Sequence, residues 1–102
     1  MVGVESKPDG AGSDDRLTVT GDVDETVMPD LRDTIESVSQ GYTRGLAIDL
    51  SEVTFLPSSA VALLAIAQHR AFLEGGVIDL VARQGTLAQR ILATCEIPHR
   101  FG

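Results

Sequence analysis

Residues 49 to 67 read DLSEVTFLPSSAVALLAIA, and this stretch decides the fold. Its first part is strand-like, and it leads through a proline and two serines, Ser58 and Ser59, into an apolar run. Residues 59 to 74 contain no glycine or proline and are rich in alanine and leucine, which favour a helix. Two glycines follow and predict its end. The stretch therefore predicts a strand that runs directly into a long helix.

The chain before this stretch predicts two strands and a helix. Residues 16 to 23 alternate apolar and polar side chains, as in a strand with one buried face. Residues 2 to 5 alternate in the same way and predict a short edge strand. Residues 7 to 15, rich in proline, glycine, serine and aspartate, predict the hairpin loop between the two strands. Apolar side chains at helical spacing predict an amphipathic helix over residues 28 to 39.

The remaining segments complete an alternation of strands and helices. The unbroken apolar run at residues 46 to 48 predicts a strand covered on both faces, as in a parallel sheet with helices packed on it. Residues 77 to 81 predict another strand. A third helix is expected after Gly85 and Thr86, followed by a stub of strand that ends near Phe101. This order predicts an α/β fold with a largely parallel sheet.

The composition fits one small domain whose partner is neither nucleic acid nor membrane. The 102 residues are enough for a single domain, of which we expect residues 1 to 13 to be partly flexible. With 8 basic and 15 acidic side chains the net charge is −7, so no basic stripe is offered to nucleic acid or to anionic lipid. The longest apolar run, residues 60 to 67, is shorter than the roughly 20 residues that span a bilayer. A partner that presents arginine or lysine suits this charge better.

Cysteine and histidine usage argues against a metal or catalytic site. The lone Cys95 excludes an internal disulfide, and the start of the chain has no apolar signal segment, so we expect a cytoplasmic protein. We interpret Cys95 as a small apolar residue that closes a helix. His69 and His99 have no ligand spacing with it, and neither a phosphate loop nor a Ser/His/Asp arrangement is evident. The sequence therefore predicts no metal, no cofactor and no enzyme.

Ser58 and Ser59 admit two interpretations. In the structural one, a serine hydroxyl accepts from a free N–H at the start of the helix and contributes about 1 kcal/mol as an N-cap, with Pro57 fixing the entry. Spacing alone favours this interpretation, because serine is a common cap. In the functional one, the hydroxyl is exposed at the carboxyl edge of the sheet, where open α/β folds place their sites. A phosphate added there would face free N–H groups and the positive end of the helix dipole.

Several blocks of the sequence resemble STAS domains, the family of bacterial anti-sigma factor antagonists. Residues 49 to 61, DLSEVTFLPSSAV, are similar to the family signature, in which an acidic residue precedes two serines and a glycine follows them. The blocks GDVD at residues 21 to 24 and MPDL at residues 28 to 31 resemble a second conserved segment of the family. The shared order and spacing make the match specific from about residue 14 to the end. The resemblance implies a STAS-like α/β sandwich with a mixed, mostly parallel sheet of four to five strands and helices packed on it.

The resemblance also implies a mechanism and a set of site residues. In the family, an anti-sigma factor that is itself a serine kinase phosphorylates the first serine of the pair, which is Ser58 here. The unmodified protein binds the kinase and releases a sigma factor, the phosphorylated protein does not bind, and a serine phosphatase resets it. Asp24 matches an acidic residue of the family near the switch helix, although it reads equally well as a solvated loop carboxylate. The expected partner-binding residues are thus Asp24, Pro57, Ser58 and Ser59.

The sequence departs from the family pattern at three positions near these elements. Pro57 replaces the acidic residue before the serines, Ala60 replaces the glycine after them, and Glu96 stands where the family has glycine. The sequence also stops where the family continues into a final strand and helix. Two alternatives stay open beside the switch: a STAS scaffold or decoy without phosphorylation, which Pro57 favours, and a cytoplasmic accessory subunit of a lipid or anion transporter, which the family also supplies.

Overall fold

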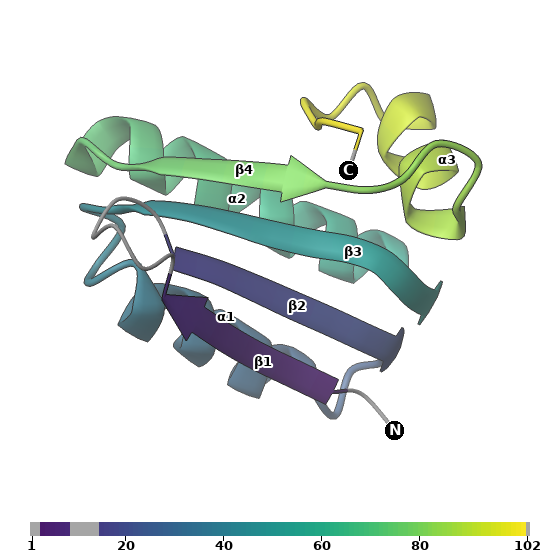
Figure 1. Ribbon diagram of the computed structural model, residues 1–102, viewed down its shortest axis with the longest axis horizontal. Coiled ribbons are helices and arrows are strands. Elements are labelled where there is room, and N and C mark those ends of the chain that lie inside the picture. Colours follow the sequence, from purple (N-terminus) through teal and green to yellow (C-terminus); the bar gives the residue numbers. More distant parts are fainter. Residues whose placement is uncertain (1–2, 9–14, 102) are drawn as a thin grey trace.

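The computed structural model of the protein describes residues 3–8 and 15–101. Four strands form one sheet in the order β1-β2-β3-β4 (Figure 1). They are β1 Gly3–Pro8, β2 Asp15–Asp22, β3 Gly45–Phe55 and β4 Val77–Val81. β1 pairs antiparallel with β2, whereas β2 with β3 and β3 with β4 are parallel pairs. The predicted mixed, mostly parallel sheet is confirmed, with the lower of the expected strand numbers.

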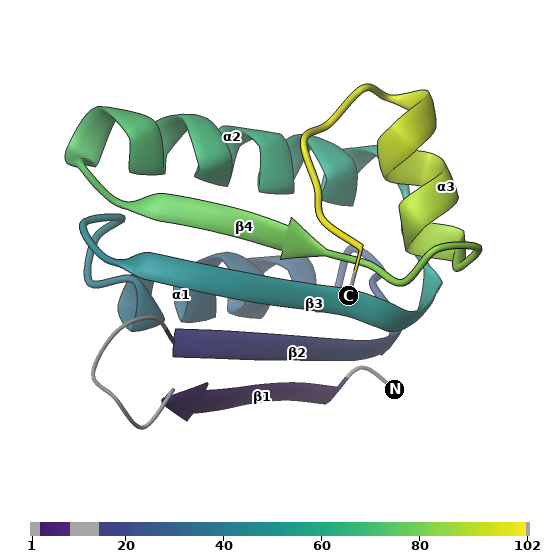
Figure 2. The same cartoon turned by 45° about the horizontal axis from the view of Figure 1, so that its top comes forward.

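Three helices connect and cover the strands: α1 Met28–Val38, α2 Ser58–Glu74 and α3 Leu87–Thr94. Figures 1 and 2 show α1 and α2 on the same face of the sheet, and α3 near the end of the sheet where β4 finishes. Gly75 ends α2 in the left-handed conformation, with φ 90°. The expected positions of all three helices are confirmed, because helical periodicity and terminal glycines are local signals.

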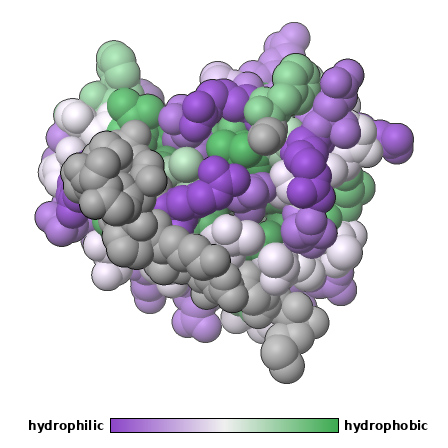
Figure 3. All heavy atoms as spheres, in the orientation of Figure 1, coloured by the Kyte–Doolittle hydropathy of each residue, from purple (hydrophilic) through white to green (hydrophobic). Residues whose placement is uncertain are grey.

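The core lies between the sheet and the pair α1 and α2. Alternate residues of β2 and of the first part of β3 point into it, as the period of a strand requires. At most 2% of each of the following core side chains is exposed: Leu17, Val19, Leu31, Ile35, Ile48, Leu50, Leu64 and Leu80. The opposite face of the sheet is polar, and Figure 3 shows hydrophilic side chains across its middle. Ion pairs hold this face, from Arg16 to Asp49 at 2.6 Å and from Arg100 to Asp79 at 3.3 Å.

β3 joins two segments that the sequence indicated separately, the apolar run at residues 46 to 48 and the strand-like residues from 49 onward. Its pairing with β2 shifts twice, so that Thr18 faces Asp49 but Thr20 faces Glu52. A second shift follows between Gly21 and the next residue of β2. Each shift adds one residue to β3 and interrupts the alternation of its side chains, a feature that the sequence analysis did not predict. The bulged part carries β3 onward to the edge at which α2 begins.

The two ends of the chain refine the sequence expectations. β1 reaches Pro8 and β2 begins at Asp15, so both ends of the predicted loop belong to strands, and its middle, like residues 1 and 2 of the expected flexible start, lies outside the described residues. The predicted terminal stub is confirmed as an isolated parallel bridge between Val81 and Arg100. Glu96, which replaces a glycine of the family, adopts φ 57°, a left-handed conformation that suits glycine. Among the described residues, no helix has the length and apolar character to cross a membrane.

Candidate functional site

The turn from β3 to α2 presents the two serines at the carboxyl edge of the sheet. Buried side chains on both sides of the serines hold it in place, since Leu56 is 5% exposed and Ala60 is fully buried. Pro57 between them is half-buried and has extended backbone angles, φ −71° and ψ 165°. Ser58 and Ser59 are both exposed. The turn is therefore fixed by apolar packing, and the serines take no part in that packing.

The expectation that a serine hydroxyl caps this helix is wrong. Pro57 occupies the N-cap position, and no side chain caps the helix there. The backbone N–H groups of Ala60 and Val61 both donate to the carbonyl oxygen of Pro57, at 3.0 and 3.1 Å. The serines are the first two helical residues, one and two positions beyond the N-cap. Within residues 3–8 and 15–101, neither hydroxyl forms a hydrogen bond.

The electrostatics of this helix start suit an anion. The first N–H groups of a helix lack partners inside the helix and carry the positive end of its dipole. The first turn of α2 contains no acidic side chain, although the chain as a whole has a net charge of −7. By contrast, the first turn of α1 contains Asp30. The start of α2 shares this lack of a first-turn carboxylate with the start of α3, so an anion at either start meets no acidic side chain of its own helix turn.

Asp24 lies at the same edge as the serines. The parallel register places Asp22 opposite Phe55, and the N–H of Val23 donates to the carbonyl of Phe55 at 2.9 Å. Asp24 follows and is exposed. Its carboxylate accepts from the hydroxyl and the N–H of Thr26, at 2.6 and 3.0 Å. The hydrogen bond from the Thr26 hydroxyl is the main cause that lowers the pKa of Asp24, so the carboxylate stays ionised near neutral pH.

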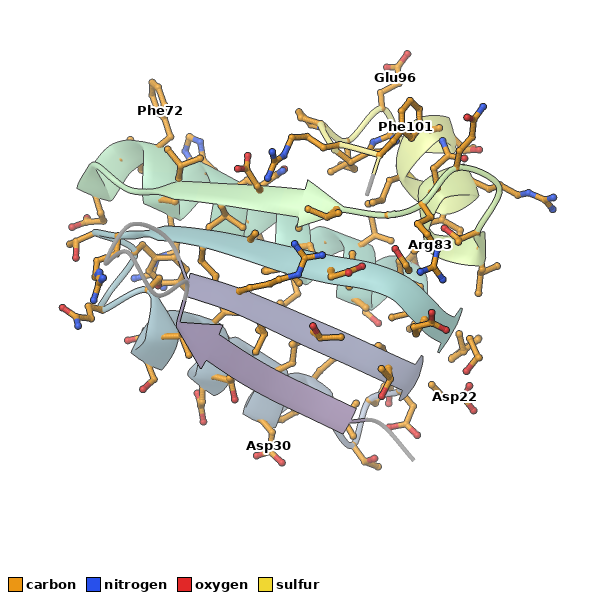
Figure 4. All side chains as sticks on the ribbon, viewed as in Figure 1. Asp22, Asp30, Phe72, Arg83, Glu96 and Phe101 are labelled. Carbon is orange, nitrogen blue, oxygen red and sulfur yellow. The ribbon has the colours of Figure 1, made fainter. Side chains whose placement is uncertain are left out.

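A further polar pair at this edge was missed by the sequence reasoning. The guanidinium of Arg83, just after β4, pairs with Glu52 of β3 at 2.6 Å. The Arg83 N–H also donates to the hydroxyl of Ser51, which is only 8% exposed, at 2.9 Å. Figure 4 shows Arg83 and Asp22 at this end of the sheet, with Phe72 at the opposite end. No local pattern links residues some 30 positions apart, so only the folded chain reveals the pair.

Exposed apolar side chains accompany the polar groups at this edge. Phe55, at the end of β3, is 50% exposed, and Leu87, at the start of α3, is 41% exposed. An aromatic residue left in water beside charged groups is typical of protein interfaces. In the sequence, the only signal of this apolar contact was the large aromatic residue Phe55, just before the turn with the serines.

The side chains that could ligate a metal are dispersed over the described residues. Nowhere in the described part of the chain do three or more His, Cys, Asp or Glu side chains gather as metal ligands would. Cys95 closes α3 as its C-cap residue, as interpreted from the sequence, but its side chain is exposed and not packed in the core. His69 is exposed on α2, and His99 contacts the carbonyl of Ile97 at 2.8 Å. The site is thus a surface, built from the ends of parallel strands and the start of α2.

Comparison with known proteins agrees with this architecture. The family model described as "Mlab, STAS domain" matches residues 6–94. The chain belongs to the STAS-domain family. An anti-sigma factor antagonist from Mycobacterium paratuberculosis is a similar solved structure, with 26% sequence identity and a TM-score of 0.77 over 99% of this chain and 86% of that one.

Two more distant structures share the fold of this STAS domain. A STAS-domain anti-sigma factor antagonist from Rhodobacter sphaeroides is 19% identical, with a TM-score of 0.63 over 78% of this chain and 85% of its own. The anti-sigma factor antagonist SpoIIAA, in its unphosphorylated form, is 14% identical, with a TM-score of 0.74 over 93% of this chain and 82% of its own. At these identities the similarity shows the fold alone.

Proposed function

We propose that this STAS domain is a cytoplasmic anti-sigma factor antagonist, which binds a serine-kinase anti-sigma factor and is switched off by phosphorylation of Ser58. The observation that carries the proposal is the hydroxyl of Ser58, exposed at the edge of the sheet and free of any structural hydrogen bond to the described residues. The similarity to an anti-sigma factor antagonist over nearly the whole chain supports the class of partner.

The physics of the helix start favours a phosphate there. A phosphoserine adds about −1.5 to −2 charges and three acceptor oxygens. Anions near a helix N-terminus gain about 0.3–1 kcal/mol from the dipole. The first turn of α2 has no carboxylate to repel the added charge. The fold therefore tolerates the modification, whereas a partner packed against this edge would have to bury the new charge.

The proposed partner surface contains Asp24, Pro57, Ser58 and Ser59, with Phe55 as an apolar contact. Asp24 is ionised, and the net charge of −7 favours a partner with arginine or lysine at its docking surface. Pro57 holds the backbone of the turn rigid, which reduces the entropy lost on docking. A serine phosphatase would restore the unmodified form, because Ser58 stays exposed in the free protein.

The first test locates the phosphate. The protein is incubated with candidate anti-sigma factor kinases and ATP, and the modified residue is identified by mass spectrometry. We expect phosphate on Ser58, its loss in Ser58→Ala, and its retention in Ser59→Ala, which removes the neighbouring hydroxyl. Phosphate found solely on Ser59 would refute the assignment.

The second test measures binding to the same kinase by calorimetry. Ser58→Ala should bind like the unmodified protein. Ser58→Asp should lose at least about tenfold in affinity, because docking would bury a charge that has no partner or that faces a charge of the same sign. The matched control is Ser37→Asp, which adds the same charge on the exposed side of α1. Equal losses in the two aspartate variants would point to net charge instead of a local switch.

Pro57 supports a second candidate function. It stands where the family has an acidic residue beside the acceptor serine, so a STAS scaffold or decoy that binds a kinase without being phosphorylated is also a prediction. Tight binding to a kinase, with no phosphate transferred to any serine, would favour that candidate. The accessory subunit of a transporter also stays a prediction, for which copurification with a membrane ATPase is the test.

A further inference from the structure

A groove of about 340 Å³ lies along α2 on the side that faces α1. Small and aliphatic residues of α2 line its wall, among them Leu63 and Ile66, and Ile66 is 58% exposed. Arg32 of α1 and Arg70 of α2 border it, and Ser59 lies at one end. This volume is within the range of small-molecule sites, about 300–1,000 Å³, which are largely apolar with a few convergent polar groups.

Tyr42 gives the groove a recessed polar group. The side chain is only 3% exposed and lines the groove. Its hydroxyl forms no hydrogen bond with any residue that the structure describes, yet no side-chain oxygen of the described residues is both sealed from solvent and unpaired. The hydroxyl is therefore open to whatever enters the groove. The hydroxyl therefore reaches solvent at the groove, where it is a hydrogen-bond donor that no described residue engages.

The backbone holds Tyr42 in an unusual conformation. Three consecutive residues, Gln40, Gly41 and Tyr42, have positive φ values of 52°, 71° and 68°. The hydroxyl of Ser39, which is fully buried, accepts from the N–H of Tyr42 at 3.0 Å and fixes this turn. A left-handed conformation costs a bulky residue of order 1–3 kcal/mol, and such strain concentrates at functional sites.

The guanidinium of Arg70 lies over the ring of Tyr42, 4.6 Å from its centre. Arg16, Arg83 and Arg100 each pair with a carboxylate. Arg70, by contrast, has no carboxylate within ion-pair distance in the described part of the chain, and Arg32 has only a loose contact with its neighbour Asp33 at 3.7 Å. Two guanidinium groups thus remain available at the groove, although the protein is acidic overall.

We propose that this groove binds a small organic carboxylate with an apolar body. The planar guanidinium of Arg70 matches a carboxylate, the Tyr42 hydroxyl donates a hydrogen bond to it, and the apolar body lies along Leu63 and Ile66. Because the hydroxyl is recessed, a small molecule can reach it more easily than the surface of a partner protein can. Such a ligand would lie beside Ser59 and hence next to the proposed switch.

The test uses octanoate as the probe. It is titrated into the protein, and backbone amide shifts are followed by ¹H–¹⁵N NMR. We expect saturable shifts centred on Tyr42, Ile66 and Arg70, with no saturable shifts from octanol, which has the apolar body without the charge. Arg70→Gln should weaken binding about tenfold, as for a charge-assisted hydrogen bond, and Tyr42→Phe about threefold. Arg90→Gln, a matched change on α3, should bind like the unchanged protein.

Any of the following results would overturn the proposal: no saturable shifts in the groove, equal binding of octanol and octanoate, or full affinity in Arg70→Gln. Tight binding of acidic peptides but not of octanoate would also overturn it, in favour of a protein partner. The amide spectrum of each variant reports directly whether it is folded. The titration contains no kinase, and Ser58→Ala should bind octanoate like the unchanged protein. The outcome of the titration is therefore independent of the proposed function.

Discussion

Two turns at the same edge of the sheet lead from a strand into a helix, and they use hydroxyl groups differently. At the start of α3, Thr86 is the N-cap, and its hydroxyl accepts from the N–H of Gln89 at 3.3 Å. At the start of α2, Pro57 holds the N-cap position, and the hydroxyls of Ser58 and Ser59 have no such role. A hydroxyl with a structural role cannot be modified without loss of stability. The comparison therefore indicates which of the two turns is free to serve as a switch.

The largest expected effect concerns the close packing at the end of α2. Since no side chain caps the start of this helix, we expect this packing to fix its position. A Cβ atom on Gly76, just after α2, would lie 2.5 Å from the carbonyl oxygen of Tyr42 and 2.7 Å from that of Arg44. Because backbone atoms cannot move aside, Gly76→Ala should cost about 3 kcal/mol of unfolding free energy in urea. Gly75→Ala meets open space but has φ 90°, so it should cost only about 1 kcal/mol. Equal costs would show that close packing does not anchor this end of α2.

The comparison itself is tested by removing each hydroxyl in turn. Thr86→Ala should lower the unfolding free energy by about 1 kcal/mol, the usual contribution of an N-cap. Ser58→Ala and Ser59→Ala should each stay within about 0.5 kcal/mol of the unchanged protein, as is usual for exposed surface positions. Thr86→Ser, which keeps the oxygen, serves as the control. If Ser58→Ala costs as much as Thr86→Ala, then Ser58 caps α2 and the contrast between the turns disappears.

Restoring a capping side chain at Pro57 sharpens the comparison. Its extended backbone suits an N-cap residue. Aspartate there would accept from an N–H of the first turn, so Pro57→Asp should be about 1 kcal/mol more stable than Pro57→Ala. The alanine variant is the proper reference, because both changes lose the rigidity of proline equally. Identical urea midpoints for the two variants would argue that this position does not act as the N-cap.

The smallest expected effect is on the pKa of Asp24. Thr26→Val removes the hydroxyl that donates to the carboxylate, so the pKa of Asp24 should rise toward its ordinary value. Because folding lowers this pKa, the associated stability is present above the pKa of the unfolded chain and is lost as the pH falls through the folded value. Carboxyl ¹³C shifts followed over an acidic pH range measure it. An unchanged titration would show that Thr26 does not hold this side chain.

Local signals in the sequence predicted much of the fold. The ends of α2 and the bounds of β4 follow from glycines and from apolar runs, which act within a few residues. The two register shifts in β3 were not predictable in this way, since they are set by pairing with β2. The position of the cap was also missed, because Pro57 and Ser58 are equally plausible at the boundary until the backbone angles are known.

The residues of the candidate site likewise fall into those expected from local motifs and those found only in the structure. Ser58 and Asp24 were expected from motifs, and the structure brings them to one edge. The Arg83–Glu52 pair and the Tyr42–Arg70 contact join residues about 30 positions apart, and no periodicity encodes such contacts. These contacts between distant parts of the chain could therefore be identified only in the folded structure.

The most direct test incorporates phosphoserine at position 58 and measures two quantities on the same sample. The account predicts an unfolding free energy within about 1 kcal/mol of the unmodified protein, because the helix dipole favours the added charge. It also predicts that affinity for the kinase partner falls at least about tenfold. Unchanged affinity, or unfolding of the phosphorylated protein, would contradict the claim that this hydroxyl has no structural role and serves as a switch.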